Sequence, residues 1–388
     1  MTKPPLPYGR QLIEDDDVEA VVAALRSDWL TQGPRVGELE QSLARACGAR
    51  HAVVVSNGTV ALHLACLAAG IGPGDEGITT PITFAASANC LRYCGAIPRF
   101  ADIRADTWNL DPDGVDRAIG PRTKALIPVH FAGLPCDMDE ICALAARRGL
   151  VVIADACHAL GATYHGQPIA AAGPAHLTCL SFHPVKHITT GEGGAILCDD
   201  DQLAARLRRL RHHGISNDPG EIAQGHGGWY YEMQLLGTNA RLPDILCALG
   251  ESQLRKLDRF VARRQAIANG YRSALAGIPG IRMQHTPEDR SHSYHLFVVW
   301  LDPDHYQRRT VYDELRRRGI YSQVHYVPCH LHPYYRRLLG TEPGQFPRAE
   351  RYYEGALSLP MFPSMTDEDV TRVTTELGSV LSAIRGSS

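Results

Sequence analysis

The sequence has no apolar stretch of the length that a membrane span requires, about 18 residues or more. Its first residues, MTKPPLPYGR, also lack the apolar core of a secretory signal. Neither sign of charge prevails, because 39 lysines and arginines stand against 42 aspartates and glutamates, a formal net charge of −3. This balance gives no electrostatic reason to bind nucleic acid or an anionic membrane. We therefore expect a cytoplasmic protein with neither kind of partner.

Cys-x-x-Cys pairs are also absent, although the chain has 11 cysteines. Most of the cysteines stand inside apolar runs, which is typical of buried thiols in a reducing compartment and not of a disulfide framework. Three histidines in the C-terminal part of the chain, His325, His330 and His332, could be metal ligands, but their spacing fits no common zinc pattern. We predict no metal site.

Strand-like and helix-like segments alternate through much of the chain, which predicts an α/β fold with a mainly parallel sheet covered on both faces. With 388 residues, two domains are expected, a large one over 1–250 that includes an N-terminal arm and a small one over 251–388. A long helix from about 243 to 274 would join them. The expected strands are 51–55, 77–81, 97–102, 125–129, 151–154, 178–182, 195–198, 294–300 and 320–326. The expected helices include 14–25, 61–69, 138–148 and 308–318, and 214–237 reads as a long loop.

Lys186 stands on a short loop between two of the apolar runs, in the stretch TCLSFHPVKHITTGEGGAIL. Burial lowers the pKa of a lysine, and a neutral amine can attack a carbonyl group. The alternative is an ordinary surface-loop lysine. The nearby glycines do not form a dinucleotide-binding fingerprint, because a strand follows them where that motif needs a helix.

Asp155 follows the apolar run 151–154, at the edge where parallel sheets bind their ligands. A carboxylate there can pair with the pyridinium nitrogen of pyridoxal phosphate (PLP) and keep the ring protonated. His158 could lie beside the same ring. The alternative is that Asp155 only caps a turn.

A tight turn, Ser-Asn-Gly-Thr, links the run 51–55 to the helix that follows it. Backbone N–H groups of Gly58 and Thr59 at the start of that helix, together with the Thr59 hydroxyl, would form a cup for a phosphate. The motif is weak alone, but with Asp155 and Lys186 in this order it predicts a PLP site.

The motifs SNGT, PITFAASAN, DACHALGA, SFHPVKHITTGEGGAI and GTNARLPDILCALG resemble those of the DegT/DnrJ/EryC1/StrS family of sugar-nucleotide aminotransferases. The resemblance implies a type I PLP-dependent aminotransferase fold, with a mainly parallel seven-stranded sheet domain and a smaller C-terminal α/β domain. It also implies a homodimer with shared active sites, which transfers an amino group from L-glutamate to a nucleotide-linked 4-keto-6-deoxy sugar. The motifs LTQGPR, SFHPVKHITT and SQVHYVP are most similar to the UDP-sugar C4 aminotransferases of pseudaminic acid biosynthesis.

The resemblance also assigns roles to residues. Lys186 and Asp155 would be catalytic, and Asn239 would reach the cofactor phosphate of the partner subunit. The residues expected at the cofactor are Gly58, Thr59, Phe84, Asp155, His158, Ser181, Lys186 and Asn239. Those expected at the substrate are Tyr8, Trp29, Thr31, Asn239, His325 and Tyr326.

Three other functions stay open. The chain could be an aminotransferase for another UDP- or dTDP-linked keto sugar, with a different position or stereochemistry. Dehydratases of the same family replace the lysine by histidine, so Lys186 disfavours that activity. A regulator that binds PLP without turnover is disfavoured because each expected catalytic position is filled.

Overall fold

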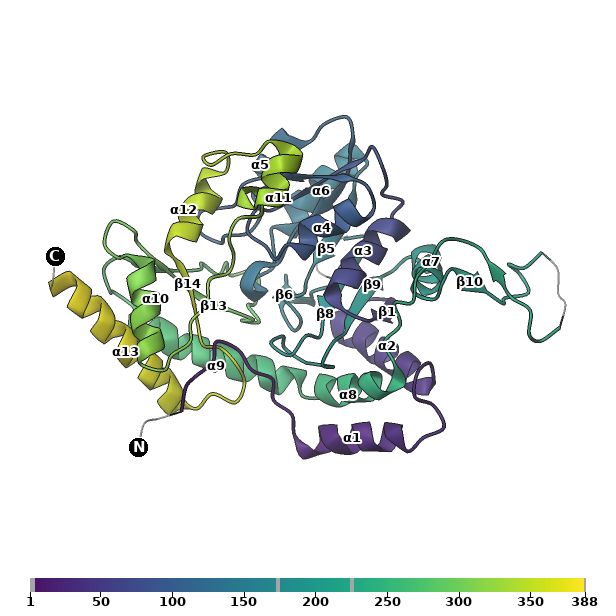
Figure 1. Cartoon of the computed structure of the whole chain (residues 1–388), viewed down its shortest axis with the longest axis horizontal. Coiled ribbons are helices and arrows are strands. Elements are labelled where there is room, and N and C mark those ends of the chain that lie inside the picture. Colours follow the sequence, from purple (N-terminus) through teal and green to yellow (C-terminus); the bar gives the residue numbers. More distant parts are fainter. Residues whose placement is uncertain (1–3, 172–174, 224–226, 387–388) are drawn as a thin grey trace.

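A mainly parallel seven-stranded sheet forms the centre of the protein, as the computed structural model shows for residues 4–171, 175–223 and 227–386 (Figure 1). The strand order is β1-β9-β8-β5-β4-β2-β3, and only β9 runs antiparallel to its neighbours. The expected α/β class is thereby confirmed, and each strand expected between 51 and 198 is present to within two residues. The strands are β1 (His51–Val55), β2 (Glu76–Thr79), β3 (Ile97–Phe100), β4 (Thr123–Ile127), β5 (Val151–Asp155), β8 (Leu177–Ser181) and β9 (Gly194–Cys198).

Helices cover both faces of this sheet, which explains why its strands are apolar at successive positions. In β1, Val53 and Val55 pack into a core with α3, α4 and α7, whereas Ala52 and Val54 face a second core with α2 and α8. The helices of this part are α1 (Asp15–Leu25), α2 (Pro34–Cys47), α3 (Gly58–Ala68), α4 (Ala86–Tyr93), α5 (Pro112–Ala118), α6 (Met138–Arg148), α7 (Asp201–Arg211) and α8 (Asp244–Leu254). A two-stranded hairpin, β6 (Thr163–Tyr164) and β7 (Gln167–Pro168), lies beside the sheet.

The expected single helix from about 243 to 274 is wrong. The structure has α8 and then α9 (Leu257–Leu275), which lie end to end above α1 in the lower half of Figure 1. The break falls at Lys256, whose buried ammonium contacts Asp16 at 2.5 Å and Asp17 at 2.8 Å. These carboxylates belong to the first turn of α1, which packs along α8, so the ion pairs tie α1 to the point where the helix is interrupted.

A second, antiparallel sheet of three strands, β12-β13-β14, has its own apolar core with α9, α10 and α13. Leu6 of the N-terminal arm is buried in that core. The expected domain boundary at residue 250 stays a prediction. The remaining elements are β12 (Ile281–Met283), β13 (Phe297–Leu301), β14 (Ala356–Leu359), α10 (Arg308–Arg317), α11 (Pro333–Leu339), α12 (Pro347–Gly355) and α13 (Asp367–Gly386).

The strand expected at 320–326 is also wrong, because this segment forms only isolated bridges. Ile320 pairs with Leu6 on the N-terminal arm, and Gln323 pairs with Ser358 of β14. The backbone thus divides its hydrogen bonds between two different partners and forms no continuous ladder with either.

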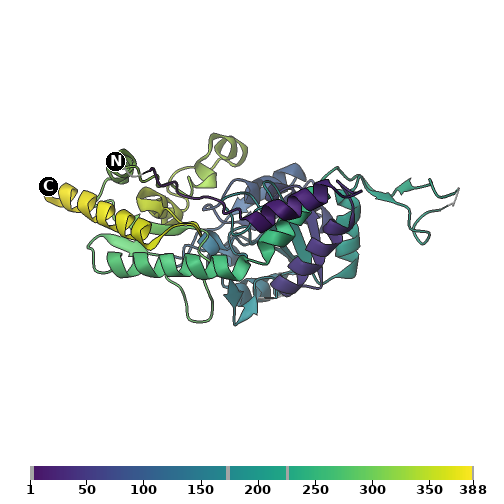
Figure 2. The same ribbon diagram turned by 90° about the horizontal axis from the view of Figure 1, so that it is seen from below.

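The expected loop 214–237 contains a small hairpin, β10 (Ile215–Ser216) and β11 (Glu232–Met233), which projects from the body of the molecule (Figure 2). It carries large apolar side chains in water, among them Trp229 at 80% and Leu236 at 84% exposure. Elsewhere, none of the helices in the described ranges is long and apolar enough to cross a membrane.

Candidate active site

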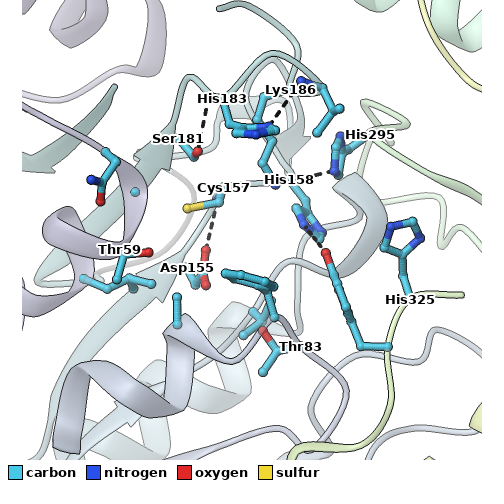
Figure 3. A pocket seen from close by; sticks show the side chains of 18 of the residues that line it. Thr59, Thr83, Asp155, Cys157, His158, Ser181, His183, Lys186, His295 and His325 are labelled. Atoms are coloured by element: carbon cyan, nitrogen blue, oxygen red, sulfur yellow. Dashed lines mark hydrogen bonds between the residues drawn. The ribbon is translucent and has the colours of Figure 1, made fainter. Parts of the chain in front are cut away.

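A cavity of about 900 Å³ opens where the seven-stranded sheet meets the C-terminal part of the chain. Its floor is the carboxyl end of β5 and β8 together with the N-terminus of α3, as parallel sheets generally place a ligand site (Figure 3). The segments around His295 and 323–326 form the opposite wall. Ten of the sequence-predicted site residues line it: Tyr8, Gly58, Thr59, Phe84, Asp155, His158, Ser181, Lys186, His325 and Tyr326.

Lys186 is partly buried, on the turn between β8 and β9, and its amine faces the cavity. Burial lowers the pKa of the Lys186 ammonium, against the opposing influence of Cys157 and Asp155. Nζ lies 3.5 Å from Nε2 of His295. The expected reactive lysine is therefore at the cavity, in surroundings that favour its neutral, nucleophilic form.

Asp155 ends β5 with its carboxylate buried beneath the cavity. The Ser87 hydroxyl donates to Oδ2 at 2.6 Å, and the backbone N–H of Cys157 donates to Oδ1 at 3.1 Å. Two donors hold the carboxylate in one orientation, so it can receive a proton-bearing ring nitrogen without rearranging.

The turn before α3 has the features of a phosphate cup. The side chain of Asn57 accepts from the N–H of Val60, and Gly58 and Thr59, whose N–H groups have no acceptor within the helix, line the cavity. A Cβ on Gly58 would lie 2.8 Å from Cβ of Ser181 and 3.2 Å from Sγ of Cys157. Only glycine fits there, and this brings the backbone donors close to the ends of β5 and β8.

Aromatic rings make the opposite wall. The hydroxyl of Tyr326 lies 3.2 Å from Nε2 of His158, and the two rings are nearly parallel with centroids 6.1 Å apart. Phe84 is 60% exposed, and its ring centroid lies 6.2 Å from that of Tyr326. Tyr8 packs against His325 at 5.4 Å. The wall offers flat apolar surface for a planar ring and a few polar groups above it.

Three predicted site residues lie outside this cavity within the chain. Trp29 is 58% exposed and Thr31 uses its carbonyl to accept from the N–H of Asp244. Asn239 is exposed at the base of the β10–β11 hairpin, where Arg241 donates to its Oδ1 at 3.0 Å. One chain alone therefore does not bring them to Lys186.

Sequence reasoning missed Ser87, His295 and Arg264. Ser87 holds Asp155, His295 touches the Lys186 amine, and the buried guanidinium of Arg264 donates to the carbonyl of Lys186 at 3.4 Å. Each comes from a distant part of the sequence, and no local motif points to the contact. Ser87 stands three residues after Phe84, in the first turn of α4, and this position does not by itself reveal the contact with Asp155.

Comparison with known proteins decides the family. The family model described as the DegT/DnrJ/EryC1/StrS aminotransferase family matches residues 11–378. The chain belongs to this family. It is accordingly a PLP-dependent sugar aminotransferase of type I fold, with a sugar substrate and an amino donor.

Relatives of several kinds resemble the chain. The spore coat polysaccharide biosynthesis protein SpsC of Bacillus subtilis is 42% identical over 371 residues, 95% of each chain. Among solved structures, PseC of Helicobacter pylori, an aminotransferase of pseudaminic acid biosynthesis, has 30% identity and a TM-score of 0.91, over 98% of this chain and 100% of that one. DesV of S. venezuelae has 35% identity and a TM-score of 0.88, over 98% and 99%.

The cavity fits PLP. The cup at Gly58 suits the phosphate, the carboxylate of Asp155 suits the ring nitrogen, and the amine of Lys186 suits the aldehyde carbon. His158 lines the same cavity, and its buried Nδ1 has no hydrogen-bond partner among the described residues, which leaves it available to a polar atom of a bound group. Within the described ranges no cluster of three or more His, Cys, Asp or Glu is placed to hold a metal ion.

Proposed function

We propose that the chain transfers an amino group from L-glutamate to a nucleotide-linked 4-keto-6-deoxy sugar, with Lys186 and Asp155 as its catalytic residues. The observation that carries this proposal is the meeting of three groups in one cavity: the Lys186 amine, the Asp155 carboxylate and the helix N-terminus at Gly58. When bound, PLP supplies an electron sink for the negative charge that develops on the substrate carbon.

The roles of the side chains follow from their positions. The Lys186 amine, whose pKa is lowered by burial, takes a proton from the amino-bearing carbon of the donor and returns one to the sugar carbon. Asp155, held by Ser87 and Cys157, keeps a proton on the ring nitrogen. Gly58, Thr59 and Ser181 bind the phosphate, and Phe84 and His158 enclose the ring. Tyr8, His325 and Tyr326 face the sugar nucleotide.

We further propose that two copies of the chain form a homodimer with shared active sites. Asn239, Trp29 and Thr31 would then serve the site of the partner, which agrees with their exposed positions outside the cavity of their own chain. The exposed apolar side chains of the β10–β11 hairpin, Trp229 and Leu236, support an interface on that side. The proposed domains, 1–250 and 251–388, would each contribute one wall of the cavity.

Within this function, amination of a UDP-linked sugar at C4 on the route to pseudaminic acid is the most specific proposal. Its support is the set of motifs shared with that branch and the likeness to PseC. Against it, SpsC and DesV have higher identity to the chain, so another UDP- or dTDP-linked keto sugar is the second candidate.

One experiment tests both. The purified protein is incubated with L-glutamate and a panel of UDP- and dTDP-4-keto-6-deoxy sugars, and the products are analysed by mass spectrometry and NMR. A new amine at C4 of a UDP-linked sugar is the expected result. Amination of a dTDP sugar only would favour the second candidate. If glutamate leaves the visible absorbance of the bound cofactor unchanged and no sugar is aminated, the proposed donor and function are both wrong.

A further inference from the structure

Among the described residues, Arg264 is a buried cation without a counter-ion, and it lies beside the Lys186 turn. It lies in the middle of α9, and its side chain is completely buried. Its guanidinium forms no ion pair with a carboxylate of the described residues, and its Nε has no hydrogen-bond partner among them. Removal from water lowers its pKa to about 10, so the group stays charged at neutral pH. A buried charge without an ion-pair partner costs free energy of folding, so its presence in the protein calls for a functional explanation.

Four backbone carbonyls solvate this charge, and they belong to three separate segments. Nη1 donates to the carbonyls of Tyr294 at 3.1 Å, His295 at 3.3 Å and Met361 at 3.1 Å, and Nη2 donates to the carbonyl of Lys186 at 3.4 Å. One planar fork therefore joins the Lys186 turn to the segment before β13 and to the chain after β14. The segment before β13 also carries the side chain of His295, whose Nε2 lies 3.5 Å from the Lys186 amine.

The charge also acts on that amine through space. Burial is the main reason that the pKa of Lys186 is lowered, and the cation of Arg264 lowers it further, against Cys157 and Asp155. The titratable groups that interact electrostatically with Lys186 are Asp155, Cys157, His158, His187, His295, His325 and Arg264, and His183, Glu192, Tyr8 and Tyr326 line the same cavity. Burial holds the pKa values of His158, His187, His295 and His325 well below neutrality, so these four histidines carry no charge at pH 7. Among the groups that interact with Lys186, Arg264 is therefore the cation that opposes the carboxylate of Asp155.

We propose that Arg264 is a positioning residue for the reaction: its buried guanidinium anchors the Lys186 turn against the segment of His295 and places a fixed positive charge beside that turn. The inference rests on the proposed role of Lys186 as proton carrier. In that role the amine must be neutral whenever it leaves the cofactor, and it must return to the same place. Lysine would supply the charge but not a planar fork that reaches four carbonyls.

The test compares Arg264→Gln and Arg264→Lys with a matched control, Arg263→Gln. Arg263 is the preceding residue of α9, but its guanidinium binds Asp367 and the carbonyl of Met365, away from the cavity. The protonation of Lys186 is measured in the pyridoxamine phosphate form, where its amine is free. Competitive acetylation across a pH series, with mass spectrometry of the Lys186 peptide, gives the midpoint.

Arg264→Gln should raise this midpoint and so slow acetylation at neutral pH several-fold, and Arg263→Gln should not move it. Arg264→Lys should keep the midpoint but lower kcat about tenfold with KM unchanged, because the charge remains and the anchor does not. A folded Arg264→Gln protein with the midpoint of Arg263→Gln overturns the inference. If Arg264→Gln does not fold, Arg264→Lys decides: wild-type kcat, or a midpoint raised despite the retained charge, overturns it.

Failure of this inference can be told apart from failure of the proposed function. In a Lys186→Ala protein, the visible absorbance of the lysine-bound cofactor should disappear. If it persists, the role of Lys186 is wrong. If it disappears while Arg264→Gln leaves the midpoint unmoved, only the inference about Arg264 is wrong.

Discussion

The two halves of the expected site differ in how one chain holds them. On the cofactor side, Asp155 is buried and held by two donors, and Lys186 is partly buried beside His295. By contrast, Trp29, expected at the substrate, and Asn239, expected at both cofactor and substrate, are exposed and lie outside the cavity. One chain thus brings most of the expected cofactor residues together in a single cavity, whereas Asn239, Trp29 and Thr31 lie outside it. In the proposed dimer these three residues would serve the site of the partner.

The largest effect should come from the centre of the cofactor side. Lys186→Ala should remove the lysine-bound absorbance and lower turnover by about 10⁴-fold or more, because the variant has no amine to hold the cofactor or carry the proton. Far-ultraviolet circular dichroism should stay unchanged. Absorbance and glutamate-dependent turnover are the measurements, and sustained turnover in a folded variant would contradict the assignment.

A smaller loss is expected at the buried carboxylate. Asp155→Asn should still bind PLP but lose about 10²- to 10³-fold in kcat, because an amide cannot keep the ring nitrogen protonated. The cofactor content of the purified variant and its steady-state rate check this. Near-wild-type kcat would mean that Asp155 only shapes the turn after β5.

Removal of the Ser87 hydroxyl, which donates to the Asp155 carboxylate, should lower kcat less than Asp155→Asn does. Ser87→Ala removes the 2.6 Å donor to Oδ2, while the N–H of Cys157 remains on Oδ1. We expect kcat to fall about tenfold with KM for glutamate unchanged, since one charge-assisted hydrogen bond is lost. Ser87→Thr keeps a hydroxyl and is the matched control. Equal rates for the alanine and threonine variants would show that the hydroxyl does not support Asp155.

These residues also show what could be predicted from the sequence and why. Asp155 was found because an apolar run such as VVIA ends at a sheet edge, and α6 because its apolar spacing and its charged ends are local features. The break at Lys256 and the irregular segment 320–326 depend on partners about 240 and 315 residues away in the sequence, Asp16 and Leu6. Ser87, His295 and Arg264 are likewise defined only by tertiary contacts, which no local pattern encodes.

The burial of His325 in the cavity wall should also affect how the free energy of unfolding depends on pH in acid. Burial lowers the pKa of His325 to about 3, whereas an unfolded histidine titrates near 6.5. Between these values the unfolded state binds a proton that the folded state does not, so stability falls as the pH drops from about 6.5 toward 3. His325→Gln should reduce this slope by about 1.4 kcal/mol per pH unit. Urea unfolding at several pH values measures it, with His285→Gln, at an exposed histidine, as the matched control. An unaltered slope in His325→Gln would contradict the account.

The most direct test of the shared active site mixes subunits of two inactive variants. Lys186→Ala removes the amine from the site of its own chain. Asn239→Ala removes a side chain that we propose serves the site of the partner, so this variant should be nearly inactive alone. After subunit exchange, a mixed dimer has one site with both defects and one with neither. We predict that each mixed dimer recovers up to about half of the wild-type activity, because one of its two sites is intact. If exchange is verified, for example by two affinity tags, and no activity returns, then Asn239 does not serve the partner and the shared site is wrong.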